Sequence, residues 1–178
     1  MDYIFTSQRL GFRNWLGTDL PKMAAINADK EVMKFFPSTQ AEAKTEEFIK
    51  RMQTQFEKHG FCYFAVEILE TNELIGFIGL SEQTYEADFT PCVDIGWRLC
   101  KTHWGKGYAT EGAKRVLQYG FEDVGLDRIL SIAPVLNKAS ESVMQKIGMH
   151  KVTTFEHSLL RDNKELKECV LYEMLNSL

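Results

Sequence analysis

The chain has 178 residues, of which 44% are hydrophobic and 26% are charged, and its formal net charge is −4 at pH 7. This length and composition are typical of a globular protein, and we expect residues 1–178 to form a single domain. No basic run exceeds two residues and no apolar run approaches the ~18 residues of a membrane span, so we expect neither nucleic-acid nor membrane partners.

The N-terminus and the cysteines indicate the compartment. The first ten residues, MDYIFTSQRL, contain neither a basic nor an apolar stretch, so we expect no signal peptide and a cytoplasmic location. The cysteines at positions 62, 92, 100 and 169 form no CxxC pair. We therefore expect reduced thiols packed as small hydrophobic groups, without a disulfide framework or a zinc site.

Hydrophobic periodicity predicts the elements of the first third of the chain. Residues 5–15 are predicted to form one strand, after which Asp19 is a candidate N-cap for a helix with Pro21 in its first turn. A short helical piece is predicted over 30–35. A longer amphipathic helix is predicted over 39–58, and Gly60 ends it.

The remaining two thirds alternate between strand and helix signals. Apolar runs at 61–69 and 73–80 predict a hairpin, and residues 82–90 read as a polar loop. The later elements are a strand at 93–99, a helix from 109, a strand at 128–133 ended by Pro134, a helix at 137–147 closed by Gly148, and strands at 149–155 and 168–175. This order predicts a mixed α/β (α+β) fold with one sheet.

The most informative segment is VDIGWRLCKTHWGKGYATEG at residues 93–112. The strand leads through a polar turn into Gly105 and Gly107, and an amphipathic helix starts at once. Two glycines at a helix N-terminus leave backbone N–H groups without partners and let a phosphate approach the main chain. The segment therefore predicts binding of a phosphorylated cofactor.

Other phosphate-binding loops fit this segment less well. A Walker A loop, Gly-x4-Gly-Lys-Ser/Thr, does not occur in the sequence. A dinucleotide-binding loop needs a third glycine where Thr110 stands, and an acidic residue where the next strand ends in Ala133. A simple tight turn explains two glycines but not the aromatic pair His103 and Trp104 beside them. A nucleotide-binding protein remains an alternative.

The segment WGKGYA at residues 104–109 resembles the Q/R-x-x-G-x-G/A acyl-CoA loop of the GNAT N-acetyltransferases, with Trp104 in place of Gln or Arg. Two further segments are similar to the RimJ/RimL branch of ribosomal-protein N-terminal acetyltransferases. They are SQRLGFR at 7–13, and Asn137 and Ser140 followed by KIGM at 146–149. The resemblance implies a GNAT-like domain, in which a central, mostly antiparallel sheet contains a splayed parallel pair and has helices on both faces.

The resemblance also implies acetyl-CoA as cosubstrate. Its pyrophosphate is expected on the amides of residues 105–110, and its pantetheine arm on backbone groups of residues 98–100. Asn137 would hydrogen-bond the arm, cap its own helix, or do both. Gly96 is a candidate bulge residue that bends its strand away from the parallel neighbour. The residues expected to bind the cofactor are Arg98, Leu99, Cys100, Trp104, Gly105, Lys106, Gly107, Tyr108, Ala109, Thr110 and Asn137.

Two residues are the catalytic candidates. Asp94 lies in the strand where the family often places an acidic residue as general base, and the alternative is a carboxylate on a polar face or paired with an arginine. Glu82 and Glu156 are further candidates for the base. Many GNAT enzymes have a tyrosine where this chain has Met144, so we expect Ser140 to donate to the leaving thiolate or, alternatively, to make a turn or cap contact.

The expected reaction is direct attack of a primary amine on the thioester, with a backbone N–H near Leu99 as oxyanion donor. An α-amine of pKa ~8 needs only ~1.4 kcal/mol to lose its proton at pH 7, whereas lysine needs about 4.6 kcal/mol, which favours an α-amine. The acceptor is a protein N-terminal α-amine or a small-molecule amine. A catalytically inactive acyl-CoA-binding sensor is the alternative.

Partners and pocket walls complete the expectations. Trp15, Phe35, Phe36 and Trp97 are candidates for acceptor-pocket walls or for core packing. We expect acceptor specificity to reside in residues 31–39 and 82–91. No histidine has metal-ligand spacing to Cys or carboxylates, so no metal is expected. The chain is expected to be a monomer or a homodimer.

Overall fold

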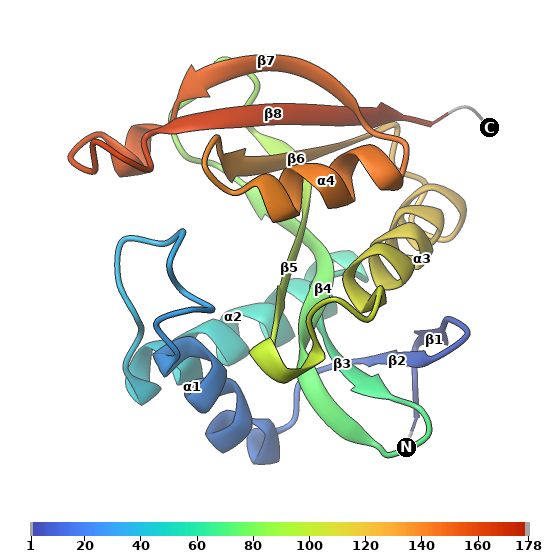
Figure 1. The fold of residues 1–178 in the computed structure, drawn as a ribbon. Helices are drawn as coiled ribbons and strands as arrows, with labels where there is room; N and C mark the ends of the chain where they lie inside the picture. The colour runs from blue at the N-terminus through green and yellow to red at the C-terminus, as the bar shows by residue number, and fades with distance from the viewer. Residues whose placement is uncertain (1, 177–178) are drawn as a thin grey trace.

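The computed structural model describes residues 2–176, which form one eight-stranded sheet in the order β1-β2-β3-β4-β5-β6-β8-β7 (Figure 1). Neighbouring strands are antiparallel except β5 and β6, which run parallel. Helices lie on both faces of this sheet (Figure 1). The expected fold class is confirmed.

The strands are β1 (Phe5–Thr6), β2 (Leu10–Arg13), β3 (Tyr63–Ile68), β4 (Glu73–Gln83), β5 (Cys92–Leu99), β6 (Arg128–Pro134), β7 (His150–Glu156) and β8 (Glu168–Leu175). The α-helices are α1 (Leu20–Ala28), α2 (Glu42–His59), α3 (Tyr108–Glu122) and α4 (Lys138–Lys146). Short 3-10 turns are η1 (Gly17–Asp19), η2 (Lys101–His103) and η3 (Ser158–Leu160). No helix among residues 2–176 is long and apolar enough to cross a membrane.

The prediction of one strand over residues 5–15 is wrong, because the segment forms the hairpin β1–β2. Its turn is held from outside by Glu111 in the first turn of α3. The Glu111 carboxylate accepts hydrogen bonds from the Ser7 hydroxyl at 2.7 Å and from the Arg9 backbone N–H at 2.8 Å. A partner about a hundred residues away therefore bends the chain where its own pattern favours a continuous strand.

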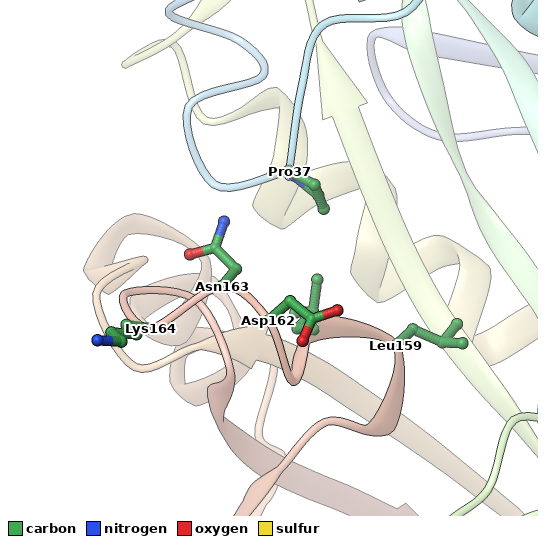
Figure 2. Close-up of a pocket in the computed structure, with 6 residues that line it drawn as sticks. Pro37, Leu159, Asp162, Asn163 and Lys164 are labelled. Atoms are coloured by element: carbon green, nitrogen blue, oxygen red, sulfur yellow. The ribbon is translucent and has the colours of Figure 1, made fainter.

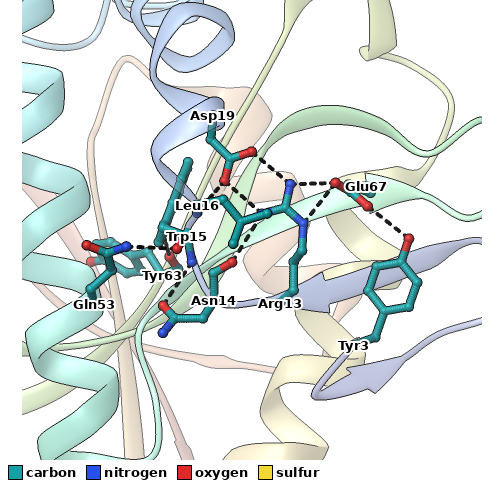
Figure 3. Close-up of polar contacts among 9 residues, drawn as sticks. All are labelled: Tyr3, Arg13, Asn14, Trp15, Leu16, Asp19, Gln53, Tyr63 and Glu67. Carbon is teal, nitrogen blue, oxygen red and sulfur yellow. Dashed lines mark hydrogen bonds and ion pairs between the residues drawn. The ribbon is translucent and has the colours of Figure 1, made fainter. Parts of the chain in front are cut away.

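Asp19 precedes α1 as predicted, but its carboxylate does not cap that helix. It accepts instead from Arg13 Nη1 at 2.7 Å and Nη2 at 2.8 Å, and from the Leu16 N–H at 2.8 Å (Figure 3). Arg13 is buried and also donates from Nε to Glu67 at 2.8 Å. The buried ion pair therefore outcompetes the local cap.

The predicted helical piece at 30–35 is also wrong, because these residues form turns. Asp29 Oδ1 accepts from the N–H of Glu31 at 2.8 Å and of Val32 at 3.3 Å, which is the side-chain turn that competes with helix propagation. The longer helix is confirmed as α2, which buries Phe48, Ile49 and Met52 and ends at Gly60 with φ 75°. The hairpin β3–β4 is confirmed as well.

Side-chain alternation decides which helices cover each face of the sheet. Phe77 in β4 lies opposite Arg98 in β5, and its ring contacts Phe48 of α2 at 5.3 Å. The next residue, Ile78, faces α3, because a Cβ added at Gly112 would lie 2.3 Å from its Cδ1. Thus α1 and α2 cover one face of β4–β5, and α3 covers the other (Figure 1).

The parallel pair is splayed, as expected. Strands β5 and β6 pair at Asp94 and Leu130, and Ser131 Oγ donates to the Ile95 carbonyl at 3.2 Å. The predicted bulge at Gly96 is wrong, because the β4–β5 register is unbroken along β5. Gly96 instead makes room for Tyr63, since an added Cβ would lie 3.1 Å from its ring.

Candidate active site

A cleft of about 1080 Å³ opens where β5 and β6 diverge. Its walls come from β5, the glycine loop, the end of β6, the start of α4, and the segments around residues 36 and 159. Eleven of the expected site residues line it: Asp94, Arg98, Leu99, Trp104, Gly105, Gly107, Tyr108, Ala109, Thr110, Asn137 and Ser140. Cys100 and Lys106 are not among the residues that line it.

The glycine loop turns directly into α3. Gly105 has φ 73° and Gly107 has φ 82°, in the left-handed region that favours glycine. Gly107 is the N-cap residue and has no side chain, so no side chain caps the N–H groups of the first helical turn. The Trp104 indole donates to the Leu99 carbonyl at 2.9 Å and fastens the loop to β5. This structure fits an anion.

Arg9 and Glu111 clamp this loop, and sequence reasoning assigned neither of them a role. Arg9 Nε contacts Glu111 at 2.6 Å, and Arg9 Nη1 donates to the Lys106 carbonyl at 3.0 Å. Its guanidinium also lies 4.5 Å over the Tyr108 ring. Burial raises the pKa of Glu111, but hydrogen bonds from Ser7 and Arg9 outweigh it and the pKa is lowered. The only sequence signal was the SQR segment of the family resemblance.

The backbone of β5 offers different groups to the cleft than expected. The Cys100 N–H donates to the Ile75 carbonyl at 2.8 Å, and the Cys100 carbonyl accepts from the His103 backbone N–H at 3.0 Å. Both backbone groups of Cys100 therefore have partners within the fold and are not available to the cofactor. Backbone groups along an antiparallel strand alternate between its two neighbours. The backbone N–H and carbonyl of Arg98 therefore also bond to β4, whereas those of Trp97 and Leu99 point toward β6. The N–H groups available in the cleft are therefore those of Trp97 and Leu99.

At the start of α4, the Asn137 side chain accepts from the Ser140 N–H at 3.1 Å and caps the helix. The Ser140 hydroxyl lines the cleft and makes no turn or cap contact within residues 2–176. Met144, one helical turn further, is 1% exposed. The Ser140 hydroxyl is thus one of the polar donors that α4 offers to the cleft, together with Ser142.

Asp94 lies at the junction of β5 and β6 on the α1–α2 face. Its Oδ1 accepts from Tyr63 Oη at 2.6 Å and from Gln83 Nε2 at 3.0 Å. Burial raises the pKa of Asp94 to about 6, although both hydrogen bonds lower it. Burial and the Asp94 charge also raise the pKa of Tyr63. The proton therefore stays on the phenol, and the carboxyl exchanges its own proton close to neutral pH.

No arginine or lysine forms an ion pair with Asp94 within residues 2–176, so its charge is not neutralised by the protein. The other base candidates lie elsewhere. Glu82 contacts His59 at 3.1 Å and Glu156 contacts Lys167 at 2.6 Å, and neither carboxylate lines the cleft. The geometry leaves Asp94 as the base candidate.

The aromatic candidates divide between core and cleft. Trp15 is 2% exposed and belongs to the core. Its indole donates a hydrogen bond of 2.7 Å to the backbone carbonyl of Tyr63 (Figure 3). Phe35, Phe36 and Trp97 line the cleft. The expected specificity loops also reach it, with Pro37 from the first and Tyr85 from the second.

A smaller cavity of about 320 Å³ adjoins the mouth of the cleft (Figure 2). It is lined by Pro37 and by residues of the segment from Leu159 to Lys164 (Figure 2). Pro37, Leu159 and Leu160 line both cavities. The β7–β8 connection is therefore a third segment beside the acceptor route, and no pattern in its residues predicted this position.

Residues 9–150 match the family model described as Acetyltransferase (GNAT) domain. The uncharacterized N-acetyltransferase YnaD of Bacillus subtilis is 31% identical over 163 residues, which cover 89% of this chain and 89% of that protein. The crystal structure of a GNAT-family acetyltransferase from Bacillus anthracis is 27% identical, with a TM-score of 0.81 over 97% of this chain and 98% of that chain.

Two solved structures named for their acceptors share the fold at lower identity. Spermidine N-acetyltransferase from Vibrio cholerae, in complex with CoA and spermine, is 20% identical with a TM-score of 0.75 over 95% of this chain and 96% of that chain. Ribosomal-protein-S5-alanine acetyltransferase from Vibrio fischeri is 19% identical with a TM-score of 0.78 over 99% of this chain and 98% of that chain. The chain described here belongs to the GNAT family and is an acetyl-CoA-dependent N-acetyltransferase.

Proposed function

We propose that acetyl-CoA binds with its pyrophosphate at the first turn of α3 and its thioester between β5 and β6. The left-handed Gly107 and the N–H groups that follow it support the first placement. The helix dipole favours an anion there by about 0.3–1 kcal/mol. The N–H group of Leu99 and the amide of Asn137 are the partners for the pantetheine arm.

The acceptor amine enters from the opposite face, between residues 31–37 of the α1–α2 connection and the β7–β8 connection. This route follows from the position of Asp94 and Tyr63, which share the face of Phe77 and α2. The two substrates then meet at the gap beside Leu130, where β5 and β6 stop pairing. A primary amine reaching this gap comes within range of the Asp94 carboxylate.

In the proposed reaction the amine nitrogen attacks the thioester carbonyl carbon, a C–N bond forms and the C–S bond breaks. The amine proton passes to the Asp94 carboxylate, whose pKa of about 6 leaves it ionised at neutral pH. The Trp97 N–H, the free β5 donor nearer to Asp94, donates to the carbonyl oxygen as charge develops, and the Ser140 hydroxyl donates a hydrogen bond to the departing thiolate. Asp94 then releases its proton to solvent and the thiolate takes one up, so the products are an N-acetyl amide and CoA.

The proposed acceptor is a protein N-terminal α-amine or a small-molecule amine, and the proposed branch is RimJ/RimL-like. The SQRLGFR segment and the likeness to the V. fischeri enzyme support the branch. The observation that carries the proposal is the half-buried Asp94 carboxylate, which accepts from Tyr63, has no ion-pair partner within residues 2–176, and lies in the same cleft as Ser140 and the glycine loop.

The test is release of CoA thiol by the purified chain with N-terminal peptides, amino acids, polyamines and aminoglycosides. We expect turnover with at least one class, and a loss of about 10²–10⁴-fold in kcat for Asp94→Asn. Ser140→Ala should lower kcat while leaving CoA affinity unchanged. Glu156→Gln, an exposed carboxylate on β7, is the matched control. Tight acetyl-CoA binding without thiol release for any amine would instead establish the acyl-CoA-binding sensor.

A further inference from the structure

Arg98 lies in the cleft on the α1–α2 face, and the proposed reaction does not use its side chain. Its Nη1 donates to Asn27 Oδ1 at 2.6 Å. The guanidinium lies 4.2 Å from the Phe36 ring centroid and 5.3 Å from that of Phe77. Burial lowers the pKa of Arg98 to about 10, so the group is still a cation at neutral pH.

This half-buried cation has no carboxylate partner within residues 2–176. Its Nε is shielded from solvent and has no hydrogen-bond partner, and the neutral amide of Asn27 is its one polar contact there. Arg13 shows how the same fold treats a comparable side chain, because it is held by the carboxylates of Asp19 and Glu67 (Figure 3). An uncompensated buried charge is unfavourable, so a negative group from outside the chain would stabilise it.

The diphosphate of CoA is not that group. Arg98 lies beside Phe77, whose ring packs on α2, whereas the glycine loop opens α3 on the other face of the sheet. Arg98 shares its face with Asp94, four residues earlier in β5. At about 3.3 Å per residue their Cα atoms lie about 13 Å apart along one wall of the acceptor route.

We propose that the amine acceptor carries a carboxylate, which Arg98 binds while the amine lies at Asp94. The inference rests on the proposed function of this cleft. A guanidinium presents two parallel N–H donors along an edge, which matches a planar carboxylate. With Nη1 held by Asn27, that edge is Nε and Nη2. Access of the carboxylate to that edge requires a displacement of the Phe36 ring, which is 40% exposed on a turn segment.

The same arrangement disfavours polyamines. A polycation entering past residues 31–37 meets Arg98 and Lys34, which both line the cleft. The negative groups that line the cleft are Asp94 and the exposed Glu31, and Asp162 lines the adjoining cavity. Acceptors with a carboxylate, such as ω-amino acids or peptides with an acidic residue near the N-terminus, place opposite charges at both ends of the wall.

The experiment compares matched acceptors in the thiol-release assay. The pairs are ω-amino acids with three to six methylenes against their primary amides, and peptides beginning Ala-Glu against Ala-Gln. For the best-fitting spacer, wild-type kcat/KM should be at least about tenfold higher for the carboxylate, the scale of a charged hydrogen bond. Arg98→Gln should reduce this ratio to about one, and Arg98→Lys should keep part of it. Lys44→Gln, which removes an exposed cation of α2 outside the cleft, should leave it intact.

Equal wild-type kcat/KM within every pair overturns the inference while leaving acetyl transfer standing. Retention of the preference in Arg98→Gln overturns it too. Should Arg98→Gln not fold, the wild-type pairs and Arg98→Lys still decide the question. Binding of the same pairs to the CoA complex, measured by calorimetry, needs no turnover. Absence of thiol release with every amine counts against the proposed function, whereas a carboxylate preference in binding would still support the role of Arg98.

Discussion

Tyr63 on β3 donates a hydrogen bond of 2.6 Å to Asp94 on β5, reaching across β4 through the space that Gly96 leaves. The bond stabilises the ionised carboxylate and so opposes the effect of burial on the pKa of Asp94. Together with Gln83 it sets the pH at which this carboxyl becomes a base.

Removing the phenol should therefore shift the pH dependence of catalysis. In Tyr63→Phe the carboxylate loses its shortest hydrogen bond, its pKa rises, and the acidic limb of the kcat/KM profile moves to higher pH. The profile is measured by thiol release between pH 5 and 9. Tyr119→Phe, which removes a hydroxyl bonded to the Gly60 carbonyl, should leave the limb in place. An unchanged acidic limb in Tyr63→Phe would mean that the Tyr63 hydroxyl does not affect the pKa of the catalytic base.

The glycine loop gives a matched test of cofactor binding. Gly107→Ala and Gly60→Ala both place a Cβ on a left-handed residue, at φ 82° and φ 75°, and each should cost about 1–2 kcal/mol of stability. CoA affinity, measured by calorimetry, should fall about tenfold or more in Gly107→Ala alone, because the loop can no longer present its N–H groups. An equal loss in Gly60→Ala would mean that global strain is the cause.

The buried ion pair under the first hairpin should dominate stability. Arg13→Met leaves the carboxylates of Asp19 and Glu67 buried without their cation, and the free energy of unfolding should fall by about 3–5 kcal/mol. Lys22→Met removes an exposed partner of Glu73 and should cost less than about 1 kcal/mol. Urea unfolding of both variants measures this difference, and similar costs would be inconsistent with the burial of Arg13.

Ionisation of the Asp94 carboxyl should lower the free energy of unfolding of the enzyme. Its folded pKa of about 6 lies above the ordinary value of 3.8, so the folded state binds the proton more tightly and loses stability as pH rises through this window. Relative to wild type, Asp94→Asn should gain about 2–3 kcal/mol between pH 4 and pH 8. Urea midpoints at both pH values give the comparison. If Asp94→Asn showed no pH-dependent gain in stability, the Asp94 carboxyl would have to be solvated in the folded protein.

Local signals predicted the parts of the site that are close in sequence. The glycines before α3, the Asn137 cap and the hairpin β3–β4 are each encoded within a few residues, and each is present. Asp94 and Ser140 were named as candidates, and both line the cleft. Their catalytic roles stay predictions.

Tertiary contacts account for what the sequence could not show. Tyr63 lies 31 residues from Asp94, and only strand pairing and a missing Cβ at Gly96 bring them together. The position of Asp19 predicts a helix cap, yet its carboxylate accepts hydrogen bonds from the buried Arg13 instead. The turn between β1 and β2 depends on Glu111, about a hundred residues away. Periodicity and capping patterns describe neighbouring residues only, so they cannot predict contacts between residues far apart in the sequence.

The most direct measurement is the pH dependence of kcat/KM for acetyl transfer by wild type and Asp94→Asn side by side. Wild-type activity should fall as pH decreases through about 6, because protonation removes the base. The residual activity of Asp94→Asn should lack that limb. An identical acidic limb in both proteins would contradict the assignment of Asp94 as the group that takes the amine proton.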